Sequence, residues 1–128
     1  MNALLDTHAF LWFLSDSPRL SATARTLIEN PDTQPFLSVG SLWEMSIKIS
    51  LGKLSIAQPF DDFISQQLNL NGIALLGITL EHTAVLTALP FHHRDPFDRL
   101  LVAQAQTENL PIVSADKAFD AYGIQRIW

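Results

Sequence analysis

The chain contains no cysteine, and this absence excludes two classes of protein. Without thiols there are no disulfide bonds and no thiolate metal sites, so neither a disulfide-stabilised secreted fold nor a cysteine zinc site is available. The first residues, MNALLDTH, do not resemble a signal peptide, since they have no basic segment and reach an acid at Asp6. We therefore expect a cytoplasmic protein.

Long apolar runs and excess positive charge are also lacking. The longest apolar run, AFLWFL at 9–14, is far too short to cross a bilayer, so we expect no membrane association. Thirteen acidic residues against eight basic ones give a net charge of −5, which argues against a basic face that coats nucleic acid. That conclusion changes if several acids bind a metal cation, because the cation supplies positive charge.

What the chain does have is an alternation of short apolar runs and amphipathic stretches over 128 residues, of which 48% are hydrophobic. This is enough to bury a core in one domain spanning 1–128. Short apolar runs predict strands at 3–6, 35–38, 73–79, 111–114 and 124–128. Amphipathic stretches predict helices at 8–15, 20–30, 60–70, 80–89 and 95–109, a helix from 41 that Gly52 ends, and a short helix from 117. Alternating strands and helices predict an α/β fold, a three-layer α/β/α sandwich around a mainly parallel sheet of about five strands.

Four acids are predicted to meet at one edge of this sheet. Asp6 ends the first strand and Asp116 follows the fourth. Glu44 and Asp98 lie in the first turns of helices that begin at the same edge. Ligands of open parallel sheets bind beyond the carboxyl ends of the strands, where the strand order reverses. The four carboxylates are therefore candidate metal ligands.

Helix capping is the alternative role for each of these acids. Asp6 and Asp116 each precede a helix and fit an N-cap. Glu44 stands three residues after Ser41, which is the spacing of a capping box, and Asp98 can complement a helix dipole. Against this, Asp98 shares an apolar helical stripe with Leu101, Val102 and Ala105, where an unpaired charge is costly. On spacing alone, a metal site and a set of caps stay equally acceptable.

The segment HHRDPFDRLLVAQA places two aspartates three residues apart, and they are predicted to have different roles. Asp95 precedes Pro96, and proline favours the first helical position, so Asp95 is the expected N-cap. Asp98 then falls at the third helical position. The histidines show neither an HExxH nor a zinc-finger spacing, so we expect no zinc site. We expect His92 and His93 to lie in a solvated loop.

Four segments in register resemble a known family. DTHAFLW, SLWEMSIKISLGKL, HHRDPFDRLLVAQA and SADKAFDAYGI, in this order and spacing, resemble PIN-domain proteins, in particular the VapC-type toxins of bacterial toxin–antitoxin pairs. The resemblance covers essentially the whole chain and implies the same α/β/α sandwich. By this resemblance, the four acidic site residues of the family correspond to Asp6, Glu44, Asp98 and Asp116, here called the quartet. Ser114 stands where many members have threonine, and Asp120 is interpreted as a surface residue.

The resemblance implies a metal-dependent endoribonuclease. Oxygen ligands favour Mg²⁺ or Mn²⁺, and one or two such ions activate a water against a phosphodiester. Asp6, Asp98 and Asp116 are the expected ligands, and Glu44 binds metal or orients the water. Thr7 and Ser114 are candidates to support the ligands. The candidates to hold RNA phosphates are Arg94, Arg99, Lys48 and Lys117. The implied partners are an RNA substrate, an antitoxin protein and a second copy of the chain in a homodimer.

Other small α/β proteins fit the sequence less well. A receiver-type signalling module requires an acceptor aspartate after the third strand, where this chain has Gly77-Ile78-Thr79. A haloacid-dehalogenase-like phosphatase requires an acid two residues after its first aspartate, and that position is His8. The remaining alternative is a PIN-type RNA-processing nuclease, or a non-catalytic RNA- or protein-binding module, that belongs to no toxin pair.

Overall fold

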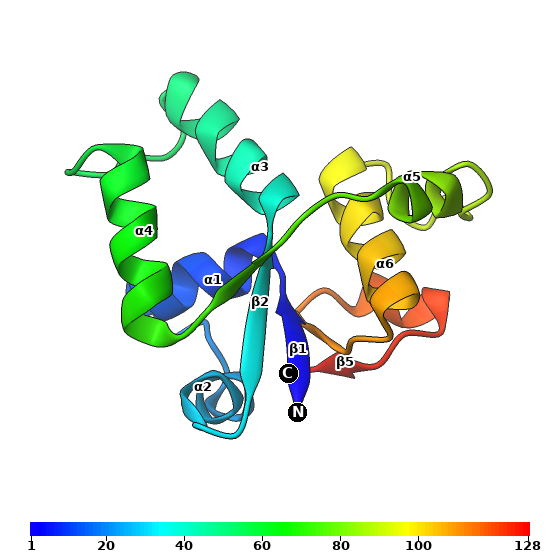
Figure 1. The fold of residues 1–128 in the computed structure, drawn as a ribbon, viewed down its shortest axis with the longest axis horizontal. Helices are drawn as coiled ribbons and strands as arrows, with labels where there is room; N and C mark the ends of the chain where they lie inside the picture. Colours follow the sequence, from blue (N-terminus) through cyan, green and yellow to red (C-terminus); the bar gives the residue numbers. More distant parts are fainter.

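The computed structural model describes residues 1–128 and centres on a five-stranded sheet (Figure 1). The strand order is β3-β2-β1-β4-β5, and every neighbouring pair is parallel. The strands are β1 Asn2–Leu5, β2 Gln34–Ser38, β3 Ala74–Leu76, β4 Ile112–Val113 and β5 Arg126–Ile127. The predicted α/β fold with five parallel strands is confirmed.

Six α-helices and one 3₁₀ helix, η1, connect the strands. They are α1 Thr7–Leu14, α2 Ala22–Glu29, α3 Val39–Ser50, α4 Phe60–Asn71, α5 Leu80–Leu86, α6 Pro96–Glu108 and η1 Lys117–Tyr122. The strand expected at 73–79 ends at Leu76, and the helix expected at 80–89 ends at Leu86. None of these helices has the length and apolar character needed to cross a membrane.

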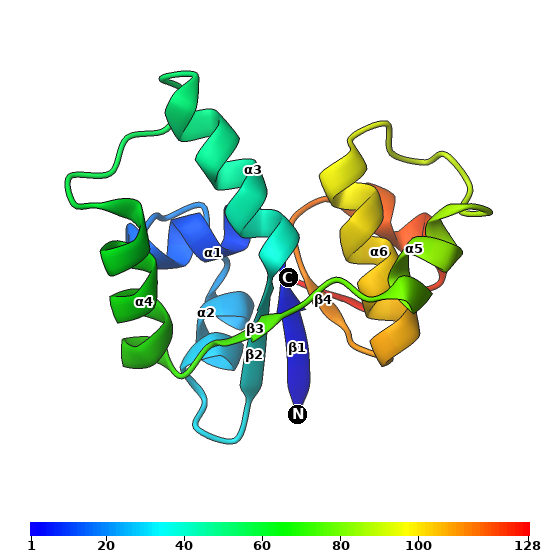
Figure 2. The ribbon, with the colours of Figure 1, turned by 45° about the horizontal axis from the view of Figure 1, so that its top comes forward.

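Alternating side chains of β1 face two separate cores. Ala3 and Leu5 are fully buried in a core with residues of α1, α2, α3 and α4, whereas Leu4 is fully buried in a second core with α6 and η1. Figures 1 and 2 show α1, α2 and α4 on one side of the sheet and α5 and α6 on the other. Each buried leucine contributes roughly 1.5–3 kcal/mol of transfer free energy. The three-layer arrangement therefore follows from a period of two in one short strand.

The strand order reverses at β1. The chain first builds outward from β1 through β2 to β3, and later returns to pair β4 with the other side of β1. The connections that leave β1 and β4 therefore diverge at the carboxyl edge, which is where open parallel sheets bind ligands. Asp6 directly follows β1, and Ser114 directly follows β4.

Two local features bring α3 and α6 to this edge. Gly40, in the first turn of α3, faces Leu100 of α6 so closely that a Cβ there would lie 2.4 Å from Leu100 Cδ2. Asp95 caps α6, since its Oδ1 accepts from the backbone N–H of Phe97 at 2.7 Å, and Pro96 occupies the first helical position. The predicted cap is confirmed, and it fixes Asp98 in the first turn.

Loss of this cap should weaken α6 measurably. We expect Asp95→Ala to lower the free energy of unfolding by about 1 kcal/mol, because the Phe97 N–H loses its acceptor. Asp95→Asn retains an oxygen acceptor, so its free energy of unfolding should fall by only a few tenths of a kcal/mol. Urea unfolding of the three proteins checks this. Equal destabilisation by asparagine and alanine would show that the side-chain oxygen does not support the helix.

Candidate active site

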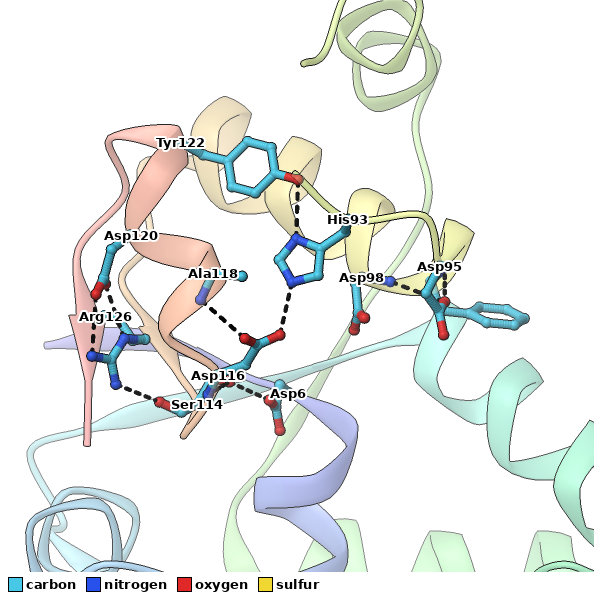
Figure 3. Close-up of polar contacts among 11 residues, drawn as sticks. Asp6, His93, Asp95, Asp98, Ser114, Asp116, Ala118, Asp120, Tyr122 and Arg126 are labelled. Atoms are coloured by element: carbon cyan, nitrogen blue, oxygen red, sulfur yellow. Dashed lines mark hydrogen bonds and ion pairs between the residues drawn. The ribbon is translucent and has the colours of Figure 1, made fainter. Parts of the chain in front are cut away.

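Asp6 is held at the end of β1 by two hydrogen bonds, of which Figure 3 shows the one from Ser114. Its Oδ1 accepts from the Ala9 N–H at 2.7 Å, which makes it the N-cap of α1, and its Oδ2 accepts from the Ser114 hydroxyl. Burial raises the pKa of the Asp6 carboxyl, and this effect exceeds the lowering by the bonds from Ser114 and Ala9. Asp6 therefore caps a helix and belongs to the site at the same time.

Glu44 projects from the second turn of α3 into a buried position. Its Oε1 accepts from the Thr7 hydroxyl at 2.8 Å, and its Oε2 lies 3.0 Å from the Lys48 ammonium. The capping-box alternative is wrong, because Ser38 caps α3, its hydroxyl oxygen accepting from the Gly40 N–H at 3.0 Å. Thr7 and Lys48 thus hold Glu44.

Asp98 lies at the third position of α6, as predicted, and no side chain donates a hydrogen bond to its carboxylate. Burial, which is the largest effect, and the negative charges of Asp95, Glu44 and Asp6 together raise the pKa of Asp98 to about 6, against a lowering by His93. The acids of β1, α3 and α6 are therefore close enough to repel one another.

Asp116 follows β4 and caps η1. Its Oδ1 accepts from the Ala118 N–H at 3.0 Å, and its Oδ2 lies 2.7 Å from His93 Nε2. Burial alone would raise the pKa of Asp116, but the hydrogen bonds from His93 and Ala118, together with the charge of Arg126, bring it below its usual value. Asp116 therefore carries its negative charge readily.

His93 is a site residue that the sequence did not reveal. The expected solvated loop is wrong for this residue, because it is buried, with its ring centroid 4.6 Å from that of Phe119 and 5.6 Å from that of Tyr122. Its Nδ1 lies 3.0 Å from the Tyr122 hydroxyl. Because a carboxylate only accepts, Nε2 carries the proton toward Asp116, and Nδ1 then accepts from Tyr122. No spacing signal links His93 with Asp116 and Tyr122, since only the fold brings them together.

The side chains of Asp6, Asp98 and Asp116 gather beneath His93 (Figure 3). One ligand atom from each of His93, Asp98 and Asp116 lies within 4.8 Å of the others. Ser114 connects Asp6 to this group, because its hydroxyl donates to Asp6 and accepts from the Asp116 N–H at 3.0 Å. Carboxylate oxygens crowded in this way fit a hard divalent cation such as Mg²⁺ or Mn²⁺.

The predicted phosphate-binding cations are only partly placed for that role. Arg99 requires a correction, since it is buried and its guanidinium donates to the carbonyls of Leu89 and Pro90 at 3.2 and 3.0 Å. Lys48 is engaged by Glu44. Arg94 and Lys117 are exposed beside the acids.

Asp120 lies outside the acid cluster. Its two carboxylate oxygens accept from Arg126 at 2.9 and 3.2 Å, and Arg126 also donates to the Ser114 carbonyl at 3.2 Å. The interpretation of Asp120 as a surface residue agrees with its exposure. This ion pair braces the segment that carries Asp116.

Neutralising Asp98 should stabilise the metal-free protein above pH 6. Its pKa rises from 3.8 unfolded to about 6 folded, so its ionisation costs folding energy above pH 6 and nothing below the unfolded pKa. The full shift corresponds to about 3 kcal/mol, and solvent screening of this half-buried group reduces the expected gain from Asp98→Asn to roughly 1–2 kcal/mol.

Urea unfolding in EDTA, from about pH 7.5 down to about pH 4, measures this effect. The advantage of Asp98→Asn should shrink as the pH falls through 6. Asp32→Asn, at an exposed turn, is the matched control and should show no such trend. A variant no more stable than wild type at pH 7.5 would contradict the repulsion inferred at Asp98.

Several solved structures share this fold, including one from Rickettsia felis and one from Neisseria gonorrhoeae. The crystal structure of VapBC2 from Rickettsia felis, bound to a DNA fragment from their promoter, matches with a TM-score of 0.71 at 12% identity, covering 98% of this chain and 97% of that chain. The crystal structure of FitAcB from Neisseria gonorrhoeae matches with a TM-score of 0.65 at 15% identity, covering 98% and 96%.

Sequence comparison extends the likeness to a named relative and a family. The chain is 29% identical over 115 residues to Ribonuclease VapC22 of Mycobacterium tuberculosis (strain ATCC 25618 / H37Rv), covering 89% of this chain and 86% of the relative. The sequence profile of the PIN domain matches residues 3–125. That match includes all four acids of the quartet, and the chain belongs to the PIN domain family.

Proposed function

We propose that this protein is a metal-dependent endoribonuclease and the toxin of a bacterial toxin–antitoxin pair. The observation that carries the proposal is the meeting of Asp6, Glu44, Asp98 and Asp116 where the strand order reverses, with the pKa of Asp98 raised to about 6. Support comes from the similarity to a protein named a ribonuclease and to structures of VapBC and FitAcB.

The acid site has the donors that Mg²⁺ or Mn²⁺ requires. Asp6, Asp98 and Asp116 are the proposed ligands of one or two ions, and Glu44 either joins them or orients the attacking water. A bound divalent cation supplies the positive charge that the site lacks and increases the acidity of water beside a phosphodiester. Positive charge among these carboxylates would offset the burial and the repulsion that raise the pKa of Asp98.

The protein orients three of the four acids by itself. Ser114 and the Ala9 N–H hold Asp6, Thr7 and Lys48 hold Glu44, and His93 and the Ala118 N–H hold Asp116. Fixed carboxylates lose little freedom when they bind a ligand, which is the advantage of a preorganised site. Asp98 retains all its lone pairs for a cation. Arg94 and Lys117 remain the proposed contacts to RNA phosphates.

Residues 1–128 would act as one nuclease domain in the cytoplasm, paired as a homodimer and bound by an antitoxin protein. The alternative is a PIN-type RNA-processing nuclease, or a non-catalytic module, without a toxin partner. In a toxin pair, the antitoxin is expected to be encoded by the neighbouring reading frame. Expression of this protein with and without that frame therefore separates the two alternatives. Growth arrest and RNA cleavage that the neighbouring frame suppresses support the toxin, whereas cleavage without arrest supports the processing enzyme.

RNA cleavage should depend on a divalent cation and on the acids of the site. We expect excess EDTA to stop cleavage and Mg²⁺ or Mn²⁺ to restore it. Asp6→Asn and Asp98→Asn should each lower the single-turnover rate on the order of 100-fold or more, because electrostatic stabilisation of the developing charge is lost. A labelled single-stranded RNA substrate measures both effects.

Asp62→Asn makes the same chemical change at an exposed position of α4 and should leave the rate within about two-fold of wild type. Circular dichroism of each variant tests that the fold is retained. Cleavage by the purified protein that persists in EDTA, or that survives both Asp6→Asn and Asp98→Asn, would overturn the proposed mechanism.

A further inference from the structure

A pocket of about 250 Å³ opens directly beside the acid site. Asp6 and Asp116 form one part of its lining, His8 and Trp12 of α1 form another, and Ala115 completes it. The two acids follow β1 and β4, so the pocket lies at the edge of the sheet where the strand order reverses. We call it the Trp12 pocket. The acid chemistry gives neither His8 nor Trp12 a role.

The side chains of His8 and Trp12 make an aromatic wall whose two ring planes are inclined by 42°. They stand four residues apart on α1 and therefore lie on one face of the helix, with ring centroids 5.7 Å apart. Trp12 is half-buried and packs against Trp128 at a centroid distance of 5.9 Å, whereas His8 is exposed. Trp12 is thus held in place by Trp128, whereas His8 is open to solvent.

A cation lies near Trp12. The Arg19 guanidinium lies 6.0 Å from the centre of the Trp12 ring, is exposed, and forms no salt bridge. By contrast, Arg25 and Arg126 are paired with acids, and Arg99 donates to buried carbonyls. In a chain with a net charge of −5, ionic contacts to phosphates are few. Affinity for a nucleic acid would have to include contacts to its bases.

We propose that the Trp12 pocket binds one nucleobase of the RNA strand, next to the phosphate held at the acid site, with the face of the base on Trp12 and an edge of the base toward His8. This inference rests on the proposed function, because it places the phosphate beside Asp6 and Asp116. Single-stranded RNA is recognised mainly by unstacked bases that stack on aromatic side chains.

Stacking explains why an acidic protein needs no basic face to bind RNA. Every base presents a π-face, so an aromatic wall binds bases with little sequence preference, and polar groups at the base edge add discrimination. In the Trp12 pocket, the exposed imidazole of His8 is the side chain that reaches such an edge. His8 is therefore the residue expected to set base preference, and Trp12 the residue expected to supply affinity.

The indole N–H signals of the three tryptophans in ¹⁵N-labelled protein test this binding without any cleavage. In Mg²⁺, the protein is titrated with adenosine or uridine 5′-monophosphate, or with ribose 5-phosphate, which has no base. We expect the nucleotides to shift the Trp12 signal saturably and ribose 5-phosphate to shift it far less. Trp43, exposed on α3, is the internal control and should stay in place.

Three results would overturn the proposal. Equal shifts from ribose 5-phosphate would mean that only the phosphate binds. Equal movement of Trp43 would mean non-specific stacking. No saturable Trp12 shift up to about 10 mM nucleotide would mean that the pocket has no useful affinity, since that range detects a millimolar Kd. None of these results depends on whether the protein cleaves RNA, so the nuclease proposal is judged separately.

Substitution of Trp12 gives the second measurement, on a single-stranded RNA substrate. Trp12→Ala should raise KM about 5- to 100-fold and leave kcat within a few-fold, because stacking binds substrate and transition state alike. Trp12→Phe keeps an aromatic face and should restore most of the loss, and Trp43→Ala should match wild type. A loss confined to kcat, or phenylalanine no better than alanine, would contradict base stacking in the Trp12 pocket.

Discussion

The burial of mutually repelling carboxylates at the reversal of strand order is the constraint on which the rest of the site depends. The parallel sheet brings Asp6 and Asp116 to adjacent strand ends, and the close approach of α3 and α6 at Gly40 adds Glu44 and Asp98. Such an arrangement opposes folding, as the raised pKa of Asp98 indicates. It persists because hydrophobic cores on both faces of the sheet stabilise the scaffold. Sites that sacrifice stability for chemistry commonly show this trade.

The same hydrogen bonds serve both the fold and the site. Asp6 and Asp116 each use one oxygen to cap a helix and the other to accept from Ser114 or His93. Capping fixes each carboxylate relative to the sheet, and the second bond fixes its rotation. Thr7 and Lys48 do the equivalent for Glu44. The acid that receives no such bond, Asp98, is the one whose pKa is raised to about 6.

The sequence predicted the features that depend on local order. The period of two in β1, the cap at Asp95 and the edge position of the four acids follow from neighbours in the chain. Contacts across the fold were not predictable in this way. His93 reaches Asp116 and Tyr122, which are 23 and 29 residues away, and these contacts turn an expected surface histidine into a buried one. The prediction that Arg99 binds phosphate was wrong because its position in a helix does not reveal that its guanidinium donates to the carbonyls of Leu89 and Pro90.

The most direct test of this account is the pKa of Asp98 with and without Mg²⁺, measured by ¹³C NMR of the labelled carboxyl group. Without the cation, the account predicts a value of about 6, set by burial and by the neighbouring acids. Saturating Mg²⁺ should bring it below the ordinary aspartate value of about 3.9, because an adjacent cation favours the ionised form. A pKa that starts near 3.9, or that Mg²⁺ leaves unchanged, would contradict the claim that these acids form a metal site.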